Sequence, residues 1–323
     1  MRLIAKALLF VAAALPLAAA AAPPRMQAIV RTGDTLELRT VDTPRPGPGQ
    51  VLVKVYAAGV NPVDWKRPTE IPGGDVGGVI DSVGEGVTAF KPGDAVIAFA
   101  RTAGYAEYAL APADFVVAKP ASFTFEQAAG VPVAGVAAYR AVTDAKVQRG
   151  QRVAIIGAAG GAGSSAVQVA RALGAHVIAS GHSSQHAYLE KLGVNEFVAF
   201  DRDDVAAKIR NVDAALNLVD GQAAAALGYV KRGGHLSSIA GPPGEGRCEA
   251  AGVTCVVIAP GYGGVSEGEA LAALSALADK GQYTVNVSRT FPLAQAQAAL
   301  DFLRNGNAVG KVVLVVDPRS AER

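Results

Sequence analysis

The chain has 323 residues, of which 50% are hydrophobic and 18% are charged, and its formal net charge is +2. This length and apolar content suit two domains with large buried cores better than one domain. The charges are nearly balanced and no Lys/Arg block occurs, so the sequence predicts neither nucleic acid nor an anionic surface as a partner.

The first 22 residues have the three-part pattern of a secretory signal. Arg2 and Lys6 give a positive start, an apolar run covers residues 7–17, and a tract of alanines precedes Pro23. The run is too short and too rich in alanine for a stable membrane span. We therefore expect residues 1–22 to be a signal peptide and the protein to be exported, to the periplasm in a bacterium. The alternative is that translation begins at Met26 and the protein is cytoplasmic.

Residues 26–118 alternate short β-rich runs with turn signals. VLVKVYAAGV (51–60) and DAVIAFA (94–100) are two such runs, and PRPGPGQ, GEG and KPGD are turn signals. The pattern predicts an all-β, barrel-like or partly open sheet.

From about residue 125 the strands alternate with helical stretches. RVAIIG (152–157) and HVIAS (176–180) read as strands, with a helix expected from near Ser164 between them, and a late helix is expected over 267–280. This alternation predicts an α/β fold with a doubly wound parallel sheet. The tail is a helical stretch followed by GKVVLVV (310–316), a strand that we expect to return to the first domain. The predicted domains are residues 26–125 with 268–323, and residues 126–267.

A glycine-rich segment between the first two strands of the second domain predicts a dinucleotide site. Its candidate cofactor-binding residues are Gly157, Ala158, Gly160, Gly161, Ala162 and Gly163. Glycines allow a tight turn and a close approach of main-chain N–H groups to a pyrophosphate. The following helix N-terminus adds free donors and a positive partial charge. The position between a strand and a helix of a βαβ unit gives the motif its weight.

The residues after the second strand bear on which nicotinamide cofactor binds. Ser180, His182 and Ser183 stand there, whereas NAD-binding chains usually place Asp or Glu at this point for the ribose hydroxyls. With no carboxylate to repel a 2′-phosphate, this segment favours NADPH, although NADH is not excluded. His182 is equally compatible with an exposed loop residue.

Cysteine and histidine are scarce. The two cysteines, Cys248 and Cys255, either form a disulfide across a short loop or are unpaired core residues. Together with four separated histidines they do not give the ligand spacing of a zinc site, so no metal is expected.

Several segments in chain order resemble one family. GVNPVDWK (59–66), GGDVGGVIDSVGEGV (73–87), QAAGVPVAGVAAY (127–139), the glycine-rich segment and GKVVLVV are similar to the zinc-independent branch of the medium-chain dehydrogenases/reductases. This branch contains quinone oxidoreductases, ζ-crystallin and enone reductases. The resemblance implies a Rossmann domain and a GroES-like catalytic domain.

The resemblance also implies what the site should hold. The zinc-dependent branch has a ligand Cys where Asn61-Pro62 stands and a Gly-His-Glu where Gly74-Asp75 stands, so a Lewis-acid alcohol dehydrogenase mechanism is not expected. Asn61 and Asp64 are implied to lie on the active-site floor, with Asp64 alternatively a turn residue. Lys66 would polarise a substrate carbonyl, or else be a surface lysine.

Further cofactor contacts are implied in the C-terminal half. Asn217 and Ile239 end later strands where relatives meet the nicotinamide end, and Lys311 would close over the phosphates. The expected function is NADPH-dependent reduction of a small quinone or α,β-unsaturated carbonyl by hydride transfer, in a chain that could form a homodimer. The alternative is a non-catalytic protein that binds a dinucleotide or another small ligand on the same fold.

Overall fold

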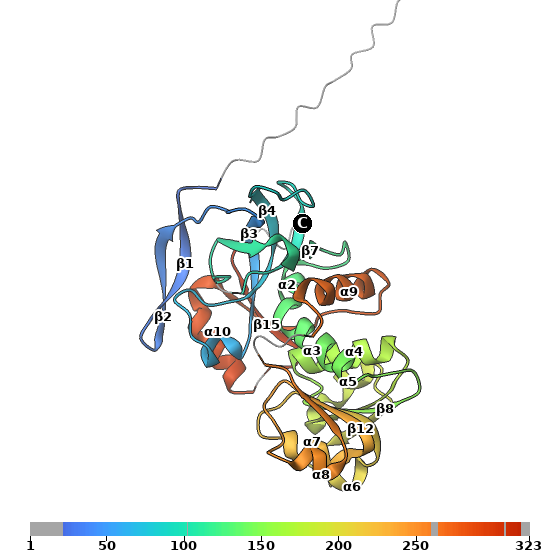
Figure 1. Cartoon of the computed structure of the whole chain (residues 1–323). Coiled ribbons are helices and arrows are strands. Elements are labelled where there is room, and N and C mark those ends of the chain that lie inside the picture. Colours follow the sequence, from blue (N-terminus) through green and yellow to red (C-terminus); the bar gives the residue numbers. More distant parts are fainter. Residues whose placement is uncertain (1–21, 102, 260–263, 307, 318–323) are drawn as a thin grey trace, which may run out of the picture.

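A computed structural model describes residues 22–101, 103–259, 264–306 and 308–317. The signal-peptide prediction falls on residues 1–22, and residues 1–21 lie outside the described part. The described chain forms two lobes that meet along α2, α3 and the last strand (Figure 1). No helix in the described ranges is both long and apolar enough to cross a membrane.

The first lobe is built on strands that pair antiparallel, except that β14 and β15 are parallel to each other. They are β1 (Arg25–Thr32), β2 (Thr35–Asp42), β3 (Gln50–Val60), β4 (Asp75–Val83), β5 (Ala95–Phe99), β6 (Tyr108–Pro112), β7 (Val116–Ala118), β14 (Val287–Pro292) and β15 (Lys311–Val315). Strands β1 and β2 form a separate hairpin, and the seven-stranded sheet has the order β14-β15-β3-β4-β5-β7 with β6 also paired to β3. The helices of this lobe are α1 (Val63–Lys66), α2 (Phe125–Ala129) and α10 (Ala296–Arg304).

The second lobe is a parallel sheet covered on both faces. Its strands are β8 (Arg152–Ile156), β9 (His176–Gly181), β10 (Glu196–Ala199), β11 (Val212–Asn217), β12 (Val230–Ser238) and β13 (Thr254–Val257). Its helices are α3 (Pro132–Asp144), α4 (Gly161–Ala172), α5 (His186–Lys191), α6 (Val205–Lys208), α7 (Ala223–Tyr229), α8 (Arg247–Ala251) and α9 (Glu267–Asp279).

The strand order of this sheet is β10-β9-β8-β11-β12-β13, and every pair is parallel. If the strands are numbered along the chain, this order is 3-2-1-4-5-6, the Rossmann order. From β8 the chain adds strands first on one side of the sheet and then on the other, so the order reverses between β8 and β11. Apolar residues of α3, α4 and α9 pack on one face, and those of α7 and α8 on the other. The predicted doubly wound α/β fold is confirmed.

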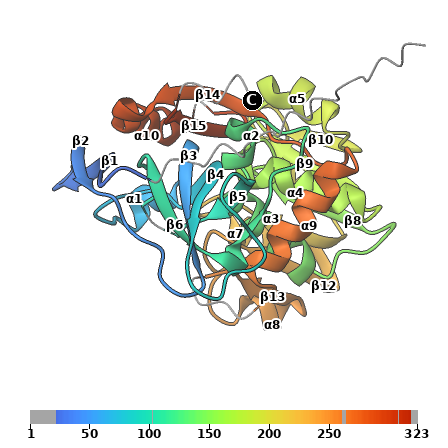
Figure 2. The same cartoon turned by 90° about the horizontal axis from the view of Figure 1, so that it is seen from above.

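The end of the chain returns to the first lobe. Strand β15 pairs antiparallel with β3 from Val312↔Val60 to Val315↔Ala57. Just before it, the Gly310 N–H donates to Ala159 O at 2.8 Å, so the final strand also touches the glycine-rich segment. Seen from above, β15 lies beside β3 and α2, with the Rossmann lobe beyond α2 (Figure 2).

Two local expectations change, and the alternatives left open for the cysteines are resolved. Helix α4 begins at Gly161 rather than near Ser164, since the glycines form its first turn. The all-β reading of the first lobe missed α1, which is a single turn directly after β3. Of the two alternatives for the cysteines, the structure has the disulfide, which joins Cys248 of α8 to Cys255 of β13.

Candidate active site

The bend after β8 has a shape that two of its glycines make possible. Gly157 has a φ of 82°, and a Cβ there would lie 2.4 Å from Val219 Cγ2. At Gly163 a Cβ would lie 2.1 Å from the Gly157 carbonyl oxygen, which is backbone and cannot move aside. The helix can therefore start directly against the strand end only with glycine at these positions.

Some main-chain N–H groups of the glycine-rich segment already donate within the protein, and others are free to bind a ligand. The Ala158 N–H donates to Ser180 O at 3.2 Å, and the Gly160 N–H donates to Gly157 O at 3.2 Å. The N–H groups of Ala162 and Gly163 are in the first turn of a 12-residue helix, where no partner exists within the helix, whereas Gly161 follows the parallel bridge between Gly160 and Gly310. These first-turn amides and the positive end of the helix dipole form the part of the bend that suits a pyrophosphate.

The segment after β9 is more tied down than the sequence indicated. The Ser180 side chain is buried in the sheet, with the residue 4% exposed. His182 Nδ1 accepts the Ser184 N–H at 3.2 Å, and Ser183 donates through both its N–H and its hydroxyl to Asp201, a residue that follows β10.

The ends of β11 and β12 are held together by a buried amide. Asn217 is fully buried, and its Nδ2 donates to Ser238 Oγ at 2.9 Å. The Ile239 N–H donates to Asn217 O at 3.1 Å. Asn217 thus fixes the edge of the sheet at which ligands of this fold bind, while its side chain faces the sheet itself.

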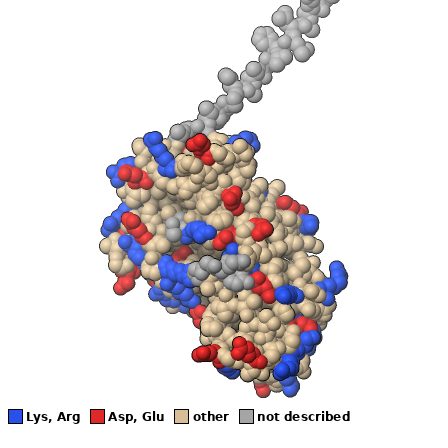
Figure 3. Space-filling view, viewed as in Figure 1, with Lys and Arg blue, Asp and Glu red and all other residues tan. Residues whose placement is uncertain are grey.

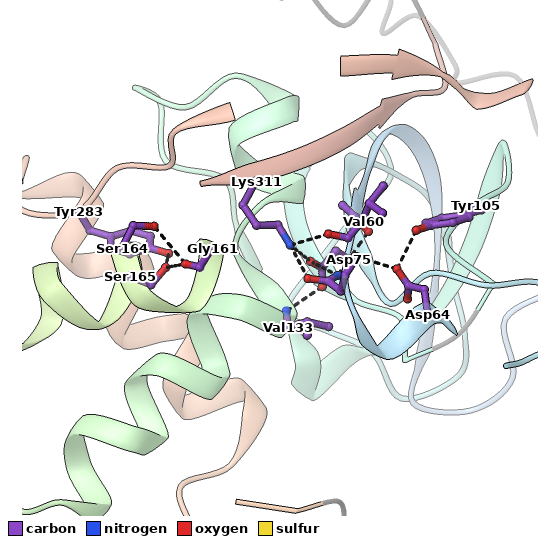
Figure 4. A network of polar contacts seen from close by, with 12 residues as sticks. Val60, Asp64, Asp75, Tyr105, Val133, Gly161, Ser164, Ser165, Tyr283 and Lys311 are labelled. Carbon is purple, nitrogen blue, oxygen red and sulfur yellow. Dashed lines mark hydrogen bonds and ion pairs between the residues drawn. The ribbon is translucent and has the colours of Figure 1, made fainter. Parts of the chain in front are cut away.

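A buried polar network connects the two lobes (Figure 4). The Lys311 ammonium donates to Asn61 Oδ1, to Asp75 Oδ2 at 3.2 Å and to Val60 O at 3.3 Å. Asn61 Nδ2 donates to the same Asp75 oxygen at 2.9 Å. The other Asp75 oxygen accepts the Val133 N–H at 2.7 Å, at the N-terminus of α3, where a negative charge is favoured.

The position of Lys311 differs from the prediction that it closes over the phosphates. Its ammonium has three acceptors on the first lobe, so its charge is directed there. Its aliphatic stem touches the bend instead, since a Cβ at Gly161 would lie 2.7 Å from Lys311 Cδ. In Figure 4 the side chain extends from beside the α4 turn toward Asp75. Lys311 therefore couples the position of the bend to that of Asn61.

Asp64 links Asn61 to Tyr105 through hydrogen bonds. Its Oδ2 accepts the Asn61 N–H at 2.8 Å and the Tyr105 hydroxyl at 2.7 Å. Burial raises the pKa of Asp64 to about 6, and these two hydrogen bonds oppose the rise. Burial, with the charge of Asp64 beside it, also raises the pKa of Tyr105 well above its usual value, so the phenol stays protonated and donates.

Lys66 reaches across to the second lobe. Its ammonium lies 2.5 Å from Asp220 Oδ2, in the loop after β11, and the two side chains are 48% and 68% exposed. Of the three predicted catalytic residues, Asn61 and Asp64 meet in one buried network, whereas Lys66 stands apart in this exposed ion pair.

Sequence reasoning missed four residues that hold the site. Asp75 was noted only as the place of an absent metal ligand; it is a carboxylate directly before the apolar run VGGVI of β4, which is a readable signal of a buried polar role. Tyr105, Asp201 and Asp220 give no such signal, because each acts on a residue far away in the sequence.

Within the described ranges no three His, Cys, Asp or Glu side chains are grouped as metal ligands. Two surface hollows, of about 430 and 470 Å³, are lined by residues of the first lobe such as Lys54 and Phe291 and by none of the bend or network. Acidic and basic side chains are interspersed over both lobes on the face in view in Figure 3.

A Rossmann sheet, a glycine-rich bend at its β8 edge and a β-rich lobe covering that edge define the architecture of a nicotinamide-dependent dehydrogenase or reductase. Two family models agree. Residues 47–121 match the alcohol dehydrogenase GroES-like domain, and residues 192–314 match the zinc-binding dehydrogenases.

Individual relatives point the same way. The quinone oxidoreductase of Homo sapiens is 40% identical over 158 residues, which cover 45% of this chain and 48% of that protein. The match thus spans about half the length of this curated relative. The 2-methylene-furan-3-one reductase of Solanum lycopersicum is 29% identical over 309 residues, covering 87% of this chain and 76% of that protein.

Solved structures match over most of the chain. The quinone oxidoreductase from Coxiella burnetii superimposes with a TM-score of 0.81 at 29% identity, covering 91% of this chain and all of that one. An alcohol dehydrogenase superfamily protein from Novosphingobium aromaticivorans gives 0.82 at 30% identity, covering 90% and 100%. The chain belongs to the medium-chain dehydrogenase/reductase family, and quinone oxidoreductases are among its relatives.

Proposed function

We propose that the protein reduces a small quinone or α,β-unsaturated carbonyl at the expense of a reduced nicotinamide dinucleotide, without zinc. The observation that carries the proposal is the bend: it places first-turn amides of α4 at the point where the sheet order reverses, against a buried network that includes Asn61. The quinone oxidoreductase and enone-type reductase relatives support the substrate class.

The residues present fit a dinucleotide. Gly163 packs against the Gly157 carbonyl with no room for a Cβ, so the first turn of α4 lies directly against the end of β8. Val219 and Phe200 are 39% and 58% exposed at the carboxyl ends of β11 and β10, where a nicotinamide riboside and an adenine would each contact apolar surface. A nicotinamide ring bound there supplies a hydride to the substrate.

The protein groups then have separate tasks. The α4 amides would hold the negative pyrophosphate. Lys311 and Asp75 keep Asn61 and the bend in fixed relative positions. Lys66, an exposed cation beside the loop after β11, would stabilise the negative charge that grows on the substrate carbonyl oxygen once its ammonium is released from Asp220. Solvent supplies the proton that completes the reduction.

Turnover with several acceptors tests the proposal. Purified protein is mixed with NADH or NADPH and with 1,4-benzoquinone, 9,10-phenanthrenequinone or an alkenal, and absorbance of the reduced nicotinamide is followed. The Gly163→Ala variant measures the direct, uncatalysed reaction. The proposal expects oxidation well above this control with at least one acceptor, and rates equal to the control with every acceptor contradict it.

The second candidate, a non-catalytic dinucleotide-binding protein, is favoured by one observation. The Lys66 ammonium is already paired with Asp220, so the cation that the mechanism needs is occupied in this structure. Dinucleotide binding without turnover on any acceptor would select this candidate.

We also propose that the protein acts outside the cytoplasm. The signal-like residues 1–22 support export, and the Cys248–Cys255 disulfide is typical of an oxidising compartment. Cell fractionation with N-terminal sequencing tests this proposal: a periplasmic chain that starts at residue 21 or 22 supports it, and a cytoplasmic chain that starts at Met1 or Met26 contradicts it.

A further inference from the structure

The carboxylate of Asp201, which follows β10, lies beside the loop after β9, where the local sequence contains no Asp or Glu. β10 lies parallel to β9, with Ala199 opposite Gly181, and the Phe200 N–H donates to Gly181 O at 3.0 Å. The residue after Phe200 is Asp201, so its side chain reaches the loop that follows β9. In a Rossmann fold this loop borders the adenosine ribose of the cofactor, and a carboxylate here distinguishes a free 2′-hydroxyl from a 2′-phosphate.

Asp201 accepts the hydrogen bonds from Ser183 that a 2′-phosphate would need. The Ser183 N–H donates to Asp201 Oδ1 at 2.7 Å, and the Ser183 hydroxyl donates to Asp201 Oδ2 at 2.8 Å. His182 Nε2 lies 3.5 Å from the same Oδ2, and its Nδ1 accepts the Ser184 N–H. The hydroxyl and imidazole groups that favoured NADPH in the sequence are thus turned toward a negative charge.

The carboxylate is ionised at neutral pH. Some desolvation acts against ionisation, but the hydrogen bonds from Ser183 lower the pKa of Asp201 below its usual value. The neighbouring cation is Arg202, whose Nε lies 3.6 Å from Asp201 Oδ2 with its side chain 75% exposed. The contact of this guanidinium with Asp201 offsets part of its charge at the point where a 2′-phosphate would bind.

The adenine end has a matching platform. The exposed Phe200 ring packs edge-on against His182, with ring centroids 5.8 Å apart. An adenine stacked on Phe200 would carry its ribose past Ser183 and Asp201, within reach of the carboxylate.

We infer that Asp201 is a specificity-determining residue that makes the protein prefer NADH to NADPH, by accepting a hydrogen bond from the ribose 2′-hydroxyl and repelling a 2′-phosphate. This inference rests on the proposed function, since it concerns the cofactor of the same site. It reverses the preference read from residues 179–184 alone, because the deciding carboxylate comes from 18 residues further along the chain.

Calorimetric titration with NADH and with NADPH tests the inference apart from turnover. We expect wild-type protein to bind NADH at least about tenfold more tightly than NADPH, and Asp201→Asn to reduce this ratio by about tenfold, because the repulsion is lost and Arg202 becomes free to meet a phosphate.

Asp203→Asn is the matched control. Asp203 is a nearby carboxylate of the same loop, but it accepts from the Ala199 N–H and pairs with Lys208, so the ratio should not change. Circular dichroism melting confirms that both variants are folded. Should Asp201→Asn prove unfolded, wild-type binding of 2′,5′-ADP against 5′-AMP decides, because the two differ only in the 2′-phosphate, and 5′-AMP is expected to bind more tightly.

The outcomes separate the inference from the proposed function. Wild-type protein that binds NADPH as tightly as NADH, or a ratio that Asp201→Asn leaves unchanged, overturns the inference alone. Failure of folded protein to bind either dinucleotide overturns the inference and the proposed function together.

Discussion

The Lys311 ammonium lies 3.2 Å from the Asp75 carboxylate, with the two side chains 5% and 0% exposed. A charge pair this deeply buried is costly to assemble and more costly to break, because either partner alone is left charged and without water. In this molecule the pair joins the last strand to β4, and it lies between the glycine-rich bend and Asn61.

The first prediction concerns this pair. Lys311→Met should lower the free energy of unfolding by about 3–5 kcal/mol, measured by urea denaturation, since it leaves the Asp75 carboxylate uncompensated. Adding Asp75→Asn should recover part of the loss. Lys91→Met is the control: Lys91 is 80% exposed in its pair with Asp94 and should cost at most about 1 kcal/mol. A Lys311→Met variant as stable as the control would show that the pair has no structural weight.

The second prediction concerns the pH dependence of stability through Asp64. The pKa of this carboxyl is raised from 3.8 to about 6 in the folded protein, so folding favours its protonated form. Its contribution is fully present below pH 3.8 and is lost as the pH rises through about 6, for a change of about 3 kcal/mol. The stability of Asp64→Asn relative to wild type should therefore increase between pH 4 and pH 7, measured by urea midpoints.

Asp94→Asn should show no such increase, and its stability relative to wild type should stay nearly constant between pH 4 and pH 7. The hydrogen bonds that Lys91 donates lower the pKa of Asp94, so its contribution is present above the unfolded value and is lost on acidification. A stability difference for Asp64→Asn that stays constant over this pH range would contradict the raised pKa.

The third prediction concerns Lys66. Replacing it with Met should lower kcat/KM for a quinone by about tenfold or more, because a cation near the developing oxyanion is removed, and it should leave dinucleotide affinity unchanged. The exposed pair with Asp220 contributes little stability, so the melting temperature should hold. Asp220→Asn, which frees the ammonium, should not lower kcat/KM. Full activity of Lys66→Met would identify it as a surface lysine.

The fourth prediction concerns the disulfide. Cys248 and Cys255 are separated by 7 residues, and reducing the bond should cost about 2.5 kcal/mol for a loop of this length. Dithiothreitol should lower the melting temperature of wild type and have no effect on a variant with both cysteines changed to Ser. Two free thiols in the unfolded, unreduced protein would contradict the bond.

Sequence and structure agree where the fold is encoded locally. The Gly157–Gly163 segment could be found from sequence because strand, bend and helix are consecutive, and their glycines act on each other's backbone. The doubly wound sheet followed from the alternation of strands and helices for the same reason. Only the start of α4 was misplaced, since glycine is a poor helix former and its presence indicated a loop.

The contacts that the sequence did not predict join distant parts of the chain. Lys311 was expected to contact phosphates, but its position is set by Asn61, 250 residues away. Asp201 reaches Ser183 only because β10 pairs with β9, and Asp220 meets Lys66 only because the lobes face each other. Such pairings depend on strand order and lobe packing, which neither periodicity nor motif spacing contains.

The bend at Gly163 provides the most direct test of the whole account. Isothermal titration of the folded protein with NADH and NADPH should show one dinucleotide site per chain. Gly163→Ala should abolish it, because the added Cβ would lie 2.1 Å from the Gly157 carbonyl oxygen and displace the first turn of α4. Gly228→Ala in α7, where a Cβ meets no atom within 4 Å, should bind like wild type. Wild-type protein that binds neither nucleotide, or a folded Gly163→Ala variant that binds as wild type does, would contradict the claim that these amides hold a nicotinamide cofactor.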